Sequence, residues 1–264
     1  MAEVEKRRPL VLICNDDGVG ARGLRHLIDC VASLDGVDAE IVAVAPAGAC
    51  SGMSSAITIG SPLRLIEHPD YNGARVYAVT GTPVDCVKLG MHAALGGRVP
   101  DLMLSGVNHG SNSGNSNIYS GTMGAAMEAC MIGMPSVGFS LLDHSPNADF
   151  SNTTPFIQRI VRHVLANGLP PQVCLNVNMP RNCVPHGMKV TACASGRWTE
   201  EYQDYADPHG RPFYMLTGNY IDFDPENPAG DNYWLRRQYV TVTPIRPDQT
   251  DYQAIPALSA LLDD

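Results

Sequence analysis

The stretch PLVLICNDDGVGARGLRHLIDCVASL, residues 9–34, decides the fold. It begins with a short, continuous apolar run of the kind found in strands that are buried on both faces of a sheet. Apolar residues then recur at helical spacing, which predicts an amphipathic helix: Leu24, Leu27, Ile28, Val31 and Leu34. A second apolar run, AEIVAVAP, follows at residues 39–46. Strand, helix and strand within this length predict a βαβ unit.

The same alternation continues to about residue 180. Three more helices are predicted at TPVDCVKLGMHAAL (82–95), GTMGAAMEACMIG (121–133) and TPFIQRIVRHVLANG (154–168). Four more strands are predicted at ARVYAVTG (74–81), DLMLSG (101–106), PSVGFSL (135–141) and PQVCLNVNMP (171–180). We therefore expect an α/β fold with a Rossmann-like, mostly parallel open sheet and helices on both of its faces.

The alternation fails in the last third of the chain. The segments KVTACA, RPFYMLTG and WLRRQYVTVTPI are strand-like and are separated by polar, proline-rich loops, and DYQAIPALSALL is a candidate closing helix. We therefore divide the chain into an α/β core, residues 1–183, and a β-hairpin-rich C-terminal extension, residues 184–264. Because this extension has strands but no evident core of its own, we expect its hairpins to hold a homo-oligomer.

Composition excludes several classes of protein. The formal net charge of −9 argues against non-specific binding to nucleic-acid polymers or to anionic membranes. No apolar stretch is long enough to span a bilayer, and the charged start MAEVEKRR is not followed by a signal-peptide apolar region. The eight cysteines form no CxxC pair and several lie in apolar runs, which is typical of reduced, buried thiols in a cytoplasmic protein.

Three loops follow strands of the predicted sheet and meet at one edge. They are NDDG (15–18), PAGACSG (46–52) and SGVNHGSNSGNSNIYSGTMG (105–124). In open α/β sheets, ligands bind beyond the carboxyl ends of the strands. The third loop holds five Gly, five Ser and four Asn and leads into a predicted helix. A helix start offers free N–H groups to an anion, so YSGT (119–122) is a candidate phosphate cradle. The alternative is a flexible linker.

The adjacent carboxylates Asp16 and Asp17 follow the first strand. Two such groups repel each other, and a hard divalent cation such as Mg²⁺ or Mn²⁺ would remove that repulsion and bind a phosphate and a water together. The alternative interpretation is a tight Asp-Gly turn ahead of the next helix. The charge-free loop on the same edge favours the metal.

These motifs resemble the SurE (survival protein E) family, in order and spacing, over nearly the whole chain. The resemblance rests on NDDGVGARGL, VAPAGACSG…AIT, VTGTPVDCVKLG, LSGVNHGSNSG…YSGTMGAAMEA and VTVTPI…DQTDY. It implies a metal-dependent acid phosphatase that hydrolyses nucleoside 5′- and 3′-monophosphates, with short polyphosphate as a further substrate of some members. The adjacency of Asp16 and Asp17 favours a water activated by the metal as the nucleophile. The resemblance also implies a C-terminal extension that swaps between subunits, in a homodimer or homotetramer.

The resemblance also assigns residues. It implies one divalent ion per subunit, Mg²⁺ or Mn²⁺, with the ligands Asp16, Asp17, Ser51 and Asn108. Asp16 and Asn108 would also take part in catalysis. The phosphate-binding set would be Ser120, Gly121, Thr122 and Asn112. This chain departs from the family pattern at Ala49 and Cys50, where a basic or amide residue often precedes the serine ligand, and at Arg22, where proline is frequent.

Other readings of the same motifs fit less well. A dinucleotide-binding dehydrogenase needs GxGxxG after the first strand, where this chain has NDDGVG. An aspartyl-phosphate phosphatase places its two acids one residue apart, whereas Asp16 and Asp17 are adjacent. A non-catalytic nucleotide-sensing module on the same site is the remaining alternative. His109, inside the third loop, is a candidate for a catalytic or leaving-group role, and EEYQDYADPHGRPFY (200–214) for a lid, a base-stacking wall or a subunit contact.

Overall fold

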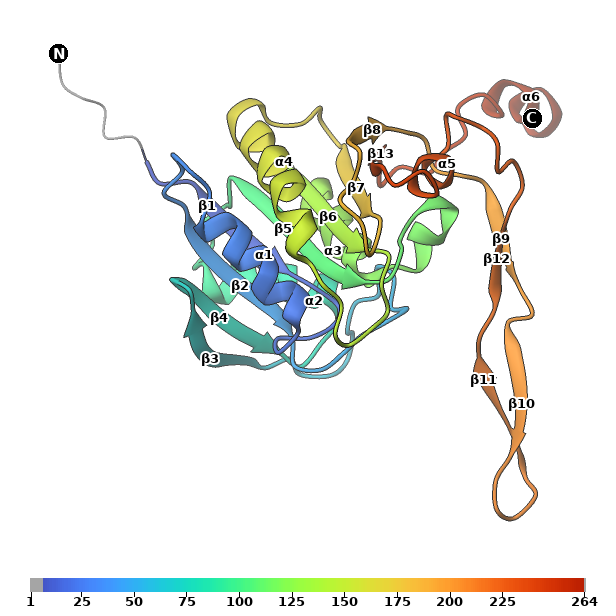
Figure 1. Cartoon of the computed structure of the whole chain (residues 1–264), viewed down its shortest axis with the longest axis horizontal. Coiled ribbons are helices and arrows are strands. Elements are labelled where there is room, and N and C mark those ends of the chain that lie inside the picture. The colour runs from blue at the N-terminus through green and yellow to red at the C-terminus, as the bar shows by residue number, and fades with distance from the viewer. Residues whose placement is uncertain (1–6, 264) are drawn as a thin grey trace.

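The computed structural model describes residues 7–263 and is built around one nine-stranded sheet (Figure 1). Six neighbouring strands of this sheet are parallel. In spatial order they are β4 (Ala74–Val79), β2 (Glu40–Pro46), β1 (Leu10–Cys14), β5 (Leu102–His109), β6 (Ser136–Leu141) and β7 (Cys174–Met179). The order runs outward from β1 in both directions, as in a doubly wound fold, and the predicted α/β class is confirmed.

Three further strands complete the edges of the sheet. β3 (Leu65–Tyr71) pairs antiparallel with β4 at one edge, and its charged sequence did not predict a strand. At the other edge β13 (Val240–Ile245) pairs antiparallel with β7, and β8 (Met188–Val190) pairs parallel with β13. Two strands from beyond residue 184 therefore belong to the core sheet. The division of the chain at that residue remains a prediction.

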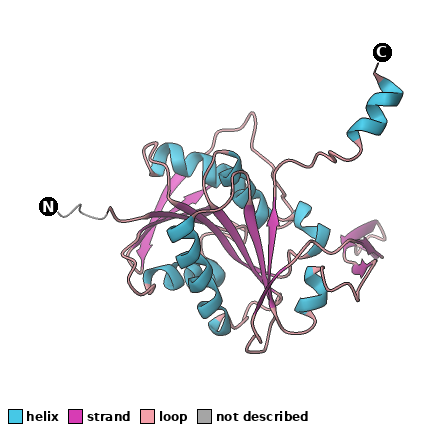
Figure 2. Ribbon diagram, turned by 90° about the horizontal axis from the view of Figure 1, so that it is seen from above, coloured by secondary structure: helices cyan, strands magenta, loops and turns pink. Residues whose placement is uncertain are grey.

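Helices cover both faces of the sheet (Figure 2). α1 (Arg22–Ala32) and α4 (Thr154–Asn167) pack into one apolar cluster on one face. α2 (Pro83–Leu89) and α3 (Gly121–Met131) pack into a second cluster on the opposite face. A π-helical turn, Gly90–Ala94, continues α2, and a 3₁₀ turn, Ser151–Thr153, precedes α4. All four predicted core helices are present.

Local signals explain where these helices begin and end. At α2, the Thr82 hydroxyl accepts the Asp85 backbone N–H at 3.2 Å, and the Asp85 carboxylate accepts the Thr82 N–H at 2.9 Å. This reciprocal pair is a capping box, and Pro83 occupies the first turn, where its missing N–H is tolerated. At the end of α4, Gly168 has a φ of 70°, a left-handed conformation that glycine adopts without strain.

The C-terminal third sends out a long two-stranded arm (Figure 1). We call residues 196–222 the arm. It contains the pairs β9 (Gly196–Thr199) with β12 (Asn219–Asp222) and β10 (Tyr202–Ala206) with β11 (Pro212–Leu216). The prediction of hairpins in this region is confirmed.

Two details of this region differ from the prediction. The segment WLRRQYVTVTPI is not one strand, because Trp234 and Leu235 end the short helix α5 (Asp231–Leu235) before β13 begins. The helix α6 (Ile255–Leu262) forms despite Pro256, which lies in its first turn where the missing N–H is tolerated. It does not close the fold, since it stands away from the body with no buried residue (Figure 2).

Among residues 7–263, no helix has the length and the apolar character needed to cross a bilayer.

The packing of α1 on β5 generates a prediction at Gly23. A β-carbon at this position would lie 1.9 Å from the backbone oxygen of Val107, so the helix and the strand approach too closely for a side chain. Gly23→Ala should destabilise the protein by about 1–3 kcal/mol through overpacking, although alanine is the better helix former. Urea unfolding measures this change.

Gly20→Ala is the matched control, because a β-carbon there meets no atom within 4 Å. Equal unfolding midpoints for the two variants would show that α1 does not pack this closely.

Candidate functional site

A cavity of about 400 Å³ opens at the carboxyl edge of the sheet. The ends of β1, β2 and β5 and the start of α3 meet there, as the three loops predict. The cavity also reaches the base of the arm. Its lining consists of Asp16, Ser51, Gly52, Asn108, His109, Gly110, Ser111, Asn112, Ser116, Tyr119, Ser120, His144, Trp198, Glu201, Leu216 and Thr217.

Asp16 is the most enclosed of the predicted metal ligands, with 5% of its surface exposed. The hydroxyl of the fully buried Thr122 donates to its Oδ1 at 2.5 Å. Burial raises the pKa of Asp16 to about 6, and the neighbouring charge of Asp17 adds to the rise, while the Thr122 bond opposes it. Gly121 lies directly against it, since a β-carbon there would be 2.9 Å from the Asp16 Cβ. A bound cation would stabilise the charged form of this carboxylate.

Asp17 and Asn108 are held from the end of β5. The backbone N–H of His109 donates to Asp17 Oδ2 at 3.2 Å. Burial raises the pKa of Asp17, and this hydrogen bond and the nearby His109 and His144 rings oppose the rise. The Asn108 side chain donates through Nδ2 to the Gly110 carbonyl at 3.0 Å. This bond uses the amide nitrogen of Asn108, so the amide oxygen, Oδ1, points in a different direction from Gly110.

Ser51 lies exposed at the rim of the same cavity. Its loop is tied to the first strand, because the Cys50 N–H donates to the Asp16 carbonyl at 2.7 Å. Within residues 7–263 no three His, Cys, Asp or Glu side chains gather as a possible metal site. A cation at this edge would therefore depend on hydroxyl and amide oxygens beside the two carboxylates. Such an all-oxygen donor set fits Mg²⁺ or Mn²⁺ and fits zinc poorly.

The predicted phosphate-binding residues lie at the start of α3. Ser120 caps the helix, its hydroxyl accepting the Met123 N–H at 3.1 Å. The Gly124 N–H donates to the Ser120 carbonyl, so the N–H groups of Gly121 and Thr122 precede the first helical hydrogen bond. The Thr122 hydroxyl, in contrast, is already engaged with Asp16. Ser120 lines the cavity, whereas Gly121 and Thr122 are not among the lining residues, and the Thr122 side chain orients a predicted metal ligand.

Asn112 lies deeper than the sequence suggests. It lines the cavity, but its Nδ2 donates to the Ser140 hydroxyl at 2.8 Å and its backbone N–H donates to Asn178 Oδ1 at 2.8 Å. Asn176 in turn donates to the Asn112 carbonyl at 2.8 Å. These bonds fix the loop to the ends of β6 and β7. The segment is therefore held in place, and the linker interpretation of this loop is wrong.

The sequence analysis also considered His109 and Arg22, and of these two residues His109 lines the cavity. Its Nδ1 lies 3.1 Å from the Ser145 carbonyl, and its ring packs edge-on against Phe150. Because a carbonyl oxygen can only accept a hydrogen bond, Nδ1 carries a proton and donates it to Ser145. The other ring nitrogen, Nε2, takes no part in this bond. Arg22 donates to the Pro146 carbonyl and is not among the residues that line the cavity.

The sequence singled out residues 200–214 as a possible wall of the site, but of that stretch only Glu201 lines the cavity, and the sequence did not single out the flanking residues Trp198, Leu216 and Thr217. Trp198, Glu201, Leu216 and Thr217 come from the base of the arm, and His144 packs its ring against Gly110. The aromatic and charged stretch 200–214 pointed to the arm. The lining, however, lies at its base, while its tip extends outward (Figure 1).

Comparison with known proteins identifies the same family that the motifs resemble. The family described as Survival protein SurE matches residues 11–200. A protein of Cytophaga hutchinsonii named 5′-nucleotidase SurE is 43% identical over 96% of both chains. A protein of the same name from Bacteroides fragilis is 41% identical over 97% of this chain and 99% of its own length. The crystal structure of the SurE protein from Aquifex aeolicus superposes with a TM-score of 0.82 at 34% identity, covering 97% of this chain and 100% of that one.

The bond between Thr122 and Asp16 generates a prediction. Thr122→Val keeps the shape of the side chain and removes the hydroxyl that orients the carboxylate. Because such supporting bonds are worth about 10- to 100-fold in metal affinity, Mn²⁺ binding should weaken by about that factor. Calorimetric titration with Mn²⁺ measures the change.

Thr241→Val is the control, since Thr241 is also buried and its hydroxyl has no hydrogen-bond partner among the described residues. Unchanged Mn²⁺ affinity in Thr122→Val would contradict a supporting role for this hydroxyl.

Proposed function

The chain belongs to the SurE family, and on that premise we propose that it is a divalent-metal-dependent 5′-nucleotidase that hydrolyses nucleoside monophosphates. The observation that carries the proposal is one cavity that joins oxygen ligands, a helix start and an aromatic wall. The name 5′-nucleotidase SurE of its relatives supports the same activity. We extend the proposal to 3′-monophosphates and short polyphosphate as further substrates.

The metal-binding part of the site consists of four residues from three loops. Asp16 and Asp17 follow β1, Ser51 follows β2 and Asn108 is the penultimate residue of β5. One divalent ion held there, Mg²⁺ or Mn²⁺, would supply positive charge to the phosphate and polarise the attacking water. The chain itself fixes the ligands before the ion arrives, Asp16 through Thr122 and Asp17 through the His109 N–H.

The phosphate would lie against the start of α3. Ser120 lines the cavity there, and the positive end of the helix dipole at Gly121 and Thr122 favours an anion. The close contact of Asp16 with Gly121 and Thr122 supports a metal ion next to the proposed phosphate. Donors that are fixed in advance stabilise charge in the transition state without reorganising. Residues 105–124 carry no Lys or Arg, so the cation has to provide most of the opposite charge.

The arm side of the cavity suits a nucleoside. Trp198 and Leu216 offer apolar surface and Glu201 a carboxylate, and the loop residues Tyr119 and Ser116 line the same cavity. The Trp198 ring is oriented by a hydrogen bond from its Nε1 to the Ser116 hydroxyl at 3.2 Å. Aromatic faces stack on bases, and carboxylates accept hydrogen bonds from ribose hydroxyls. His109, whose Nε2 is free of the Ser145 contact, is placed to exchange a proton with the leaving oxygen.

A substrate panel tests the activity. Purified protein should release phosphate from nucleoside 5′-monophosphates with Mg²⁺ or Mn²⁺, and a chelator should abolish the release. Asp16→Asn removes a charged ligand and should lower the turnover by at least about 100-fold while the protein stays folded by circular dichroism.

Asp224→Asn makes the same chemical change on the exposed surface and is the control. Tight nucleotide binding without phosphate release, at saturating metal, would instead support the nucleotide-sensing module.

We also propose that the protein is a homo-oligomer, dimeric or tetrameric, in the cytoplasm. The arm and α6 expose large apolar side chains that no part of residues 7–263 covers, including Tyr202, Phe213, Leu258 and Leu261. Exposed apolar surface of this kind marks interaction sites. The eight free cysteines support a reducing compartment. The net charge of −9 supports the absence of nucleic-acid polymers and anionic membranes among its partners.

A double substitution on α6 tests the oligomer. Leu258→Asp with Leu261→Asp removes two apolar contacts worth about 1.5–3 kcal/mol each, which weakens association by at least about 100-fold. Light scattering at micromolar concentration should then detect a monomer. Val99 is similarly exposed but lies in the α/β body, outside the arm and α6, so Val99→Asp should leave the oligomer intact. A monomeric wild-type protein would contradict the proposal.

A further inference from the structure

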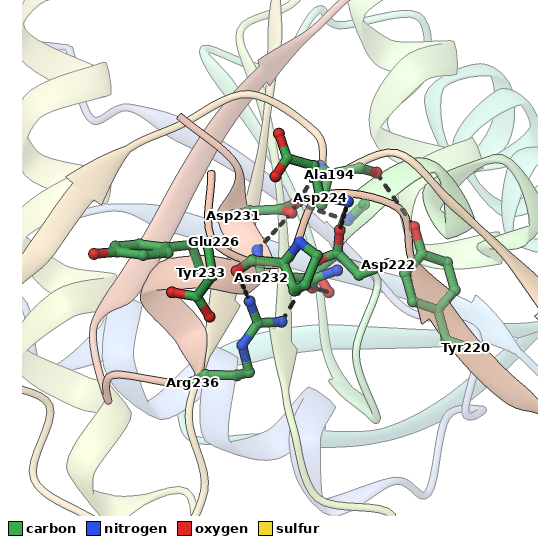
Figure 3. Close-up of polar contacts among 12 residues, drawn as sticks. Ala194, Tyr220, Asp222, Asp224, Glu226, Asp231, Asn232, Tyr233 and Arg236 are labelled. Carbon is green, nitrogen blue, oxygen red and sulfur yellow. Dashed lines mark hydrogen bonds and ion pairs between the residues drawn. The ribbon is translucent and has the colours of Figure 1, made fainter. Parts of the chain in front are cut away.

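Asp231 is a fully buried carboxylate outside the metal and phosphate sites. It is the first residue of α5, and its two oxygens accept three backbone N–H groups. Oδ2 accepts Gly114 at 2.7 Å, and Oδ1 accepts Ala194 at 3.0 Å and Asn232 at 2.8 Å. Figure 3 shows Asp231 between Ala194 and Asn232, with Tyr220 beyond.

The three N–H groups come from three different segments. Gly114 begins the 3₁₀ turn Gly114–Tyr119 in the loop ahead of α3. Ala194 lies just before the first strand of the arm, and Asn232 lies in α5. One side chain therefore joins the loop, the base of the arm and the segment that leads back to the core sheet. Burial raises the pKa of Asp231, and the three N–H bonds oppose that rise by stabilising its charge.

Neighbouring contacts hold the same part of the loop. The Ser113 hydroxyl donates to Asn232 Oδ1 at 2.7 Å, and the Asn115 N–H donates to the Ala194 carbonyl at 3.0 Å. The Tyr220 hydroxyl, from the arm, lies 2.8 Å from Asn115 Oδ1 and 3.2 Å from the Ala194 carbonyl.

The backbone at Gly114 fits this position closely. Its φ is +61°, and a β-carbon would lie 2.7 Å from the Tyr220 hydroxyl and 2.9 Å from the Ala194 carbonyl oxygen. A side chain at this point would displace the loop from the arm.

The segment that Asp231 holds forms one wall of the cavity. Ser116 lies within residues 113–117, Asn112 precedes them, and Tyr119 and Ser120 follow them; all four residues line the cavity. Asn108, the proposed metal ligand, lies in β5 and is fixed separately by the sheet. Displacement of residues 113–117 should therefore disturb the substrate wall more than the metal ligands.

We propose that Asp231 is a positioning residue for the substrate cavity, fixing residues 113–117 against the base of the arm so that the loop wall and the arm wall face each other. The kinetic part of this inference rests on the proposed nucleotidase function. The structural part does not depend on it.

Asp231→Asn tests the proposal. An amide keeps the size but offers one accepting oxygen, and its NH₂ group would face a backbone N–H. We expect kcat/KM for nucleoside 5′-monophosphates to fall by about 100-fold, as misplaced substrate groups do, mostly through KM. Mn²⁺ affinity should stay at the wild-type value. Amide hydrogen exchange should accelerate in a peptide covering residues 111–118 and stay unchanged in peptides from β1 and β5.

Two further variants complete the experiment. Asp224→Asn makes the same change at an exposed acid of the same region and should behave as wild type. Tyr220→Phe removes only the hydroxyl that contacts Asn115 and Ala194, and should shift KM and exchange in the same direction by a smaller factor.

The outcomes separate the possibilities. Wild-type kinetics and exchange in Asp231→Asn overturn the proposal, and so does an equal acceleration of exchange in all peptides, which indicates a purely structural role. If Asp231→Asn does not fold, Tyr220→Phe decides, and wild-type behaviour of that variant overturns the proposal. If the wild-type protein releases no phosphate, the proposed function fails, while exchange at residues 111–118 still tests the positioning.

Discussion

The hydrogen bond from the Thr122 hydroxyl to Asp16 is the contact on which the site depends. It joins the end of the first strand to the start of α3 across 106 residues of sequence. It forms only because Gly121 has no side chain, since a β-carbon there would press on Asp16 and on Pro83 of α2. The proposed metal ligand, the helix start and the second layer of helices therefore share one point of close packing. Because that packing is buried, its geometry is set by the fold before any ligand binds.

Two sets of side chains hold the loop ahead of α3, the asparagines of β7 and the carboxylate of Asp231. Below it, the asparagines of β7 continue the network, with Asn178 donating to Asn176 at 2.9 Å. Above it, Asp231 collects three N–H groups. A glycine- and serine-rich segment would be flexible in isolation. Here Asn112, Ser113, Gly114 and Asn115 bond to distant parts of the chain, and these bonds order the loop.

Local patterns predicted most of the fold, and long-range pairing explains the rest. The buried strands and amphipathic helices of the core follow from periodicity, and Thr82 and Gly168 mark helix ends as expected. The sequence did not predict β3, because LIEHPDY is charged and contains a proline. An edge strand tolerates such a proline and a buried strand does not. Local sequence patterns cannot predict that β13 lies between β7 and β8 in the sheet, since both neighbours are far from it in sequence.

The candidate site shows the same limit. The loops that meet at the carboxyl edge were predictable because parallel strands end together. The hydrogen-bond partner of a particular hydroxyl could not be predicted in this way, and the structure shows that the Thr122 hydroxyl donates to Asp16. Asp231 stands in the mixed stretch PAGDNYW (228–234), in which the sequence analysis identified no motif. The arm residues that line the cavity, such as Trp198, come from a hairpin whose direction the sequence does not encode locally.

The place of β13 in the sheet has a consequence for how the chain is made. Among residues 7–263, β8 pairs with the sheet through β13 alone, and β13 is synthesised some fifty residues later. While the ribosome is still translating the arm, β7 is an open edge with unpaired backbone groups. The nascent protein must keep that edge from other chains until residues 240–245 have left the exit tunnel. Completion of the sheet thus waits for nearly the whole chain, and the arm is translated before the core that bears it is closed.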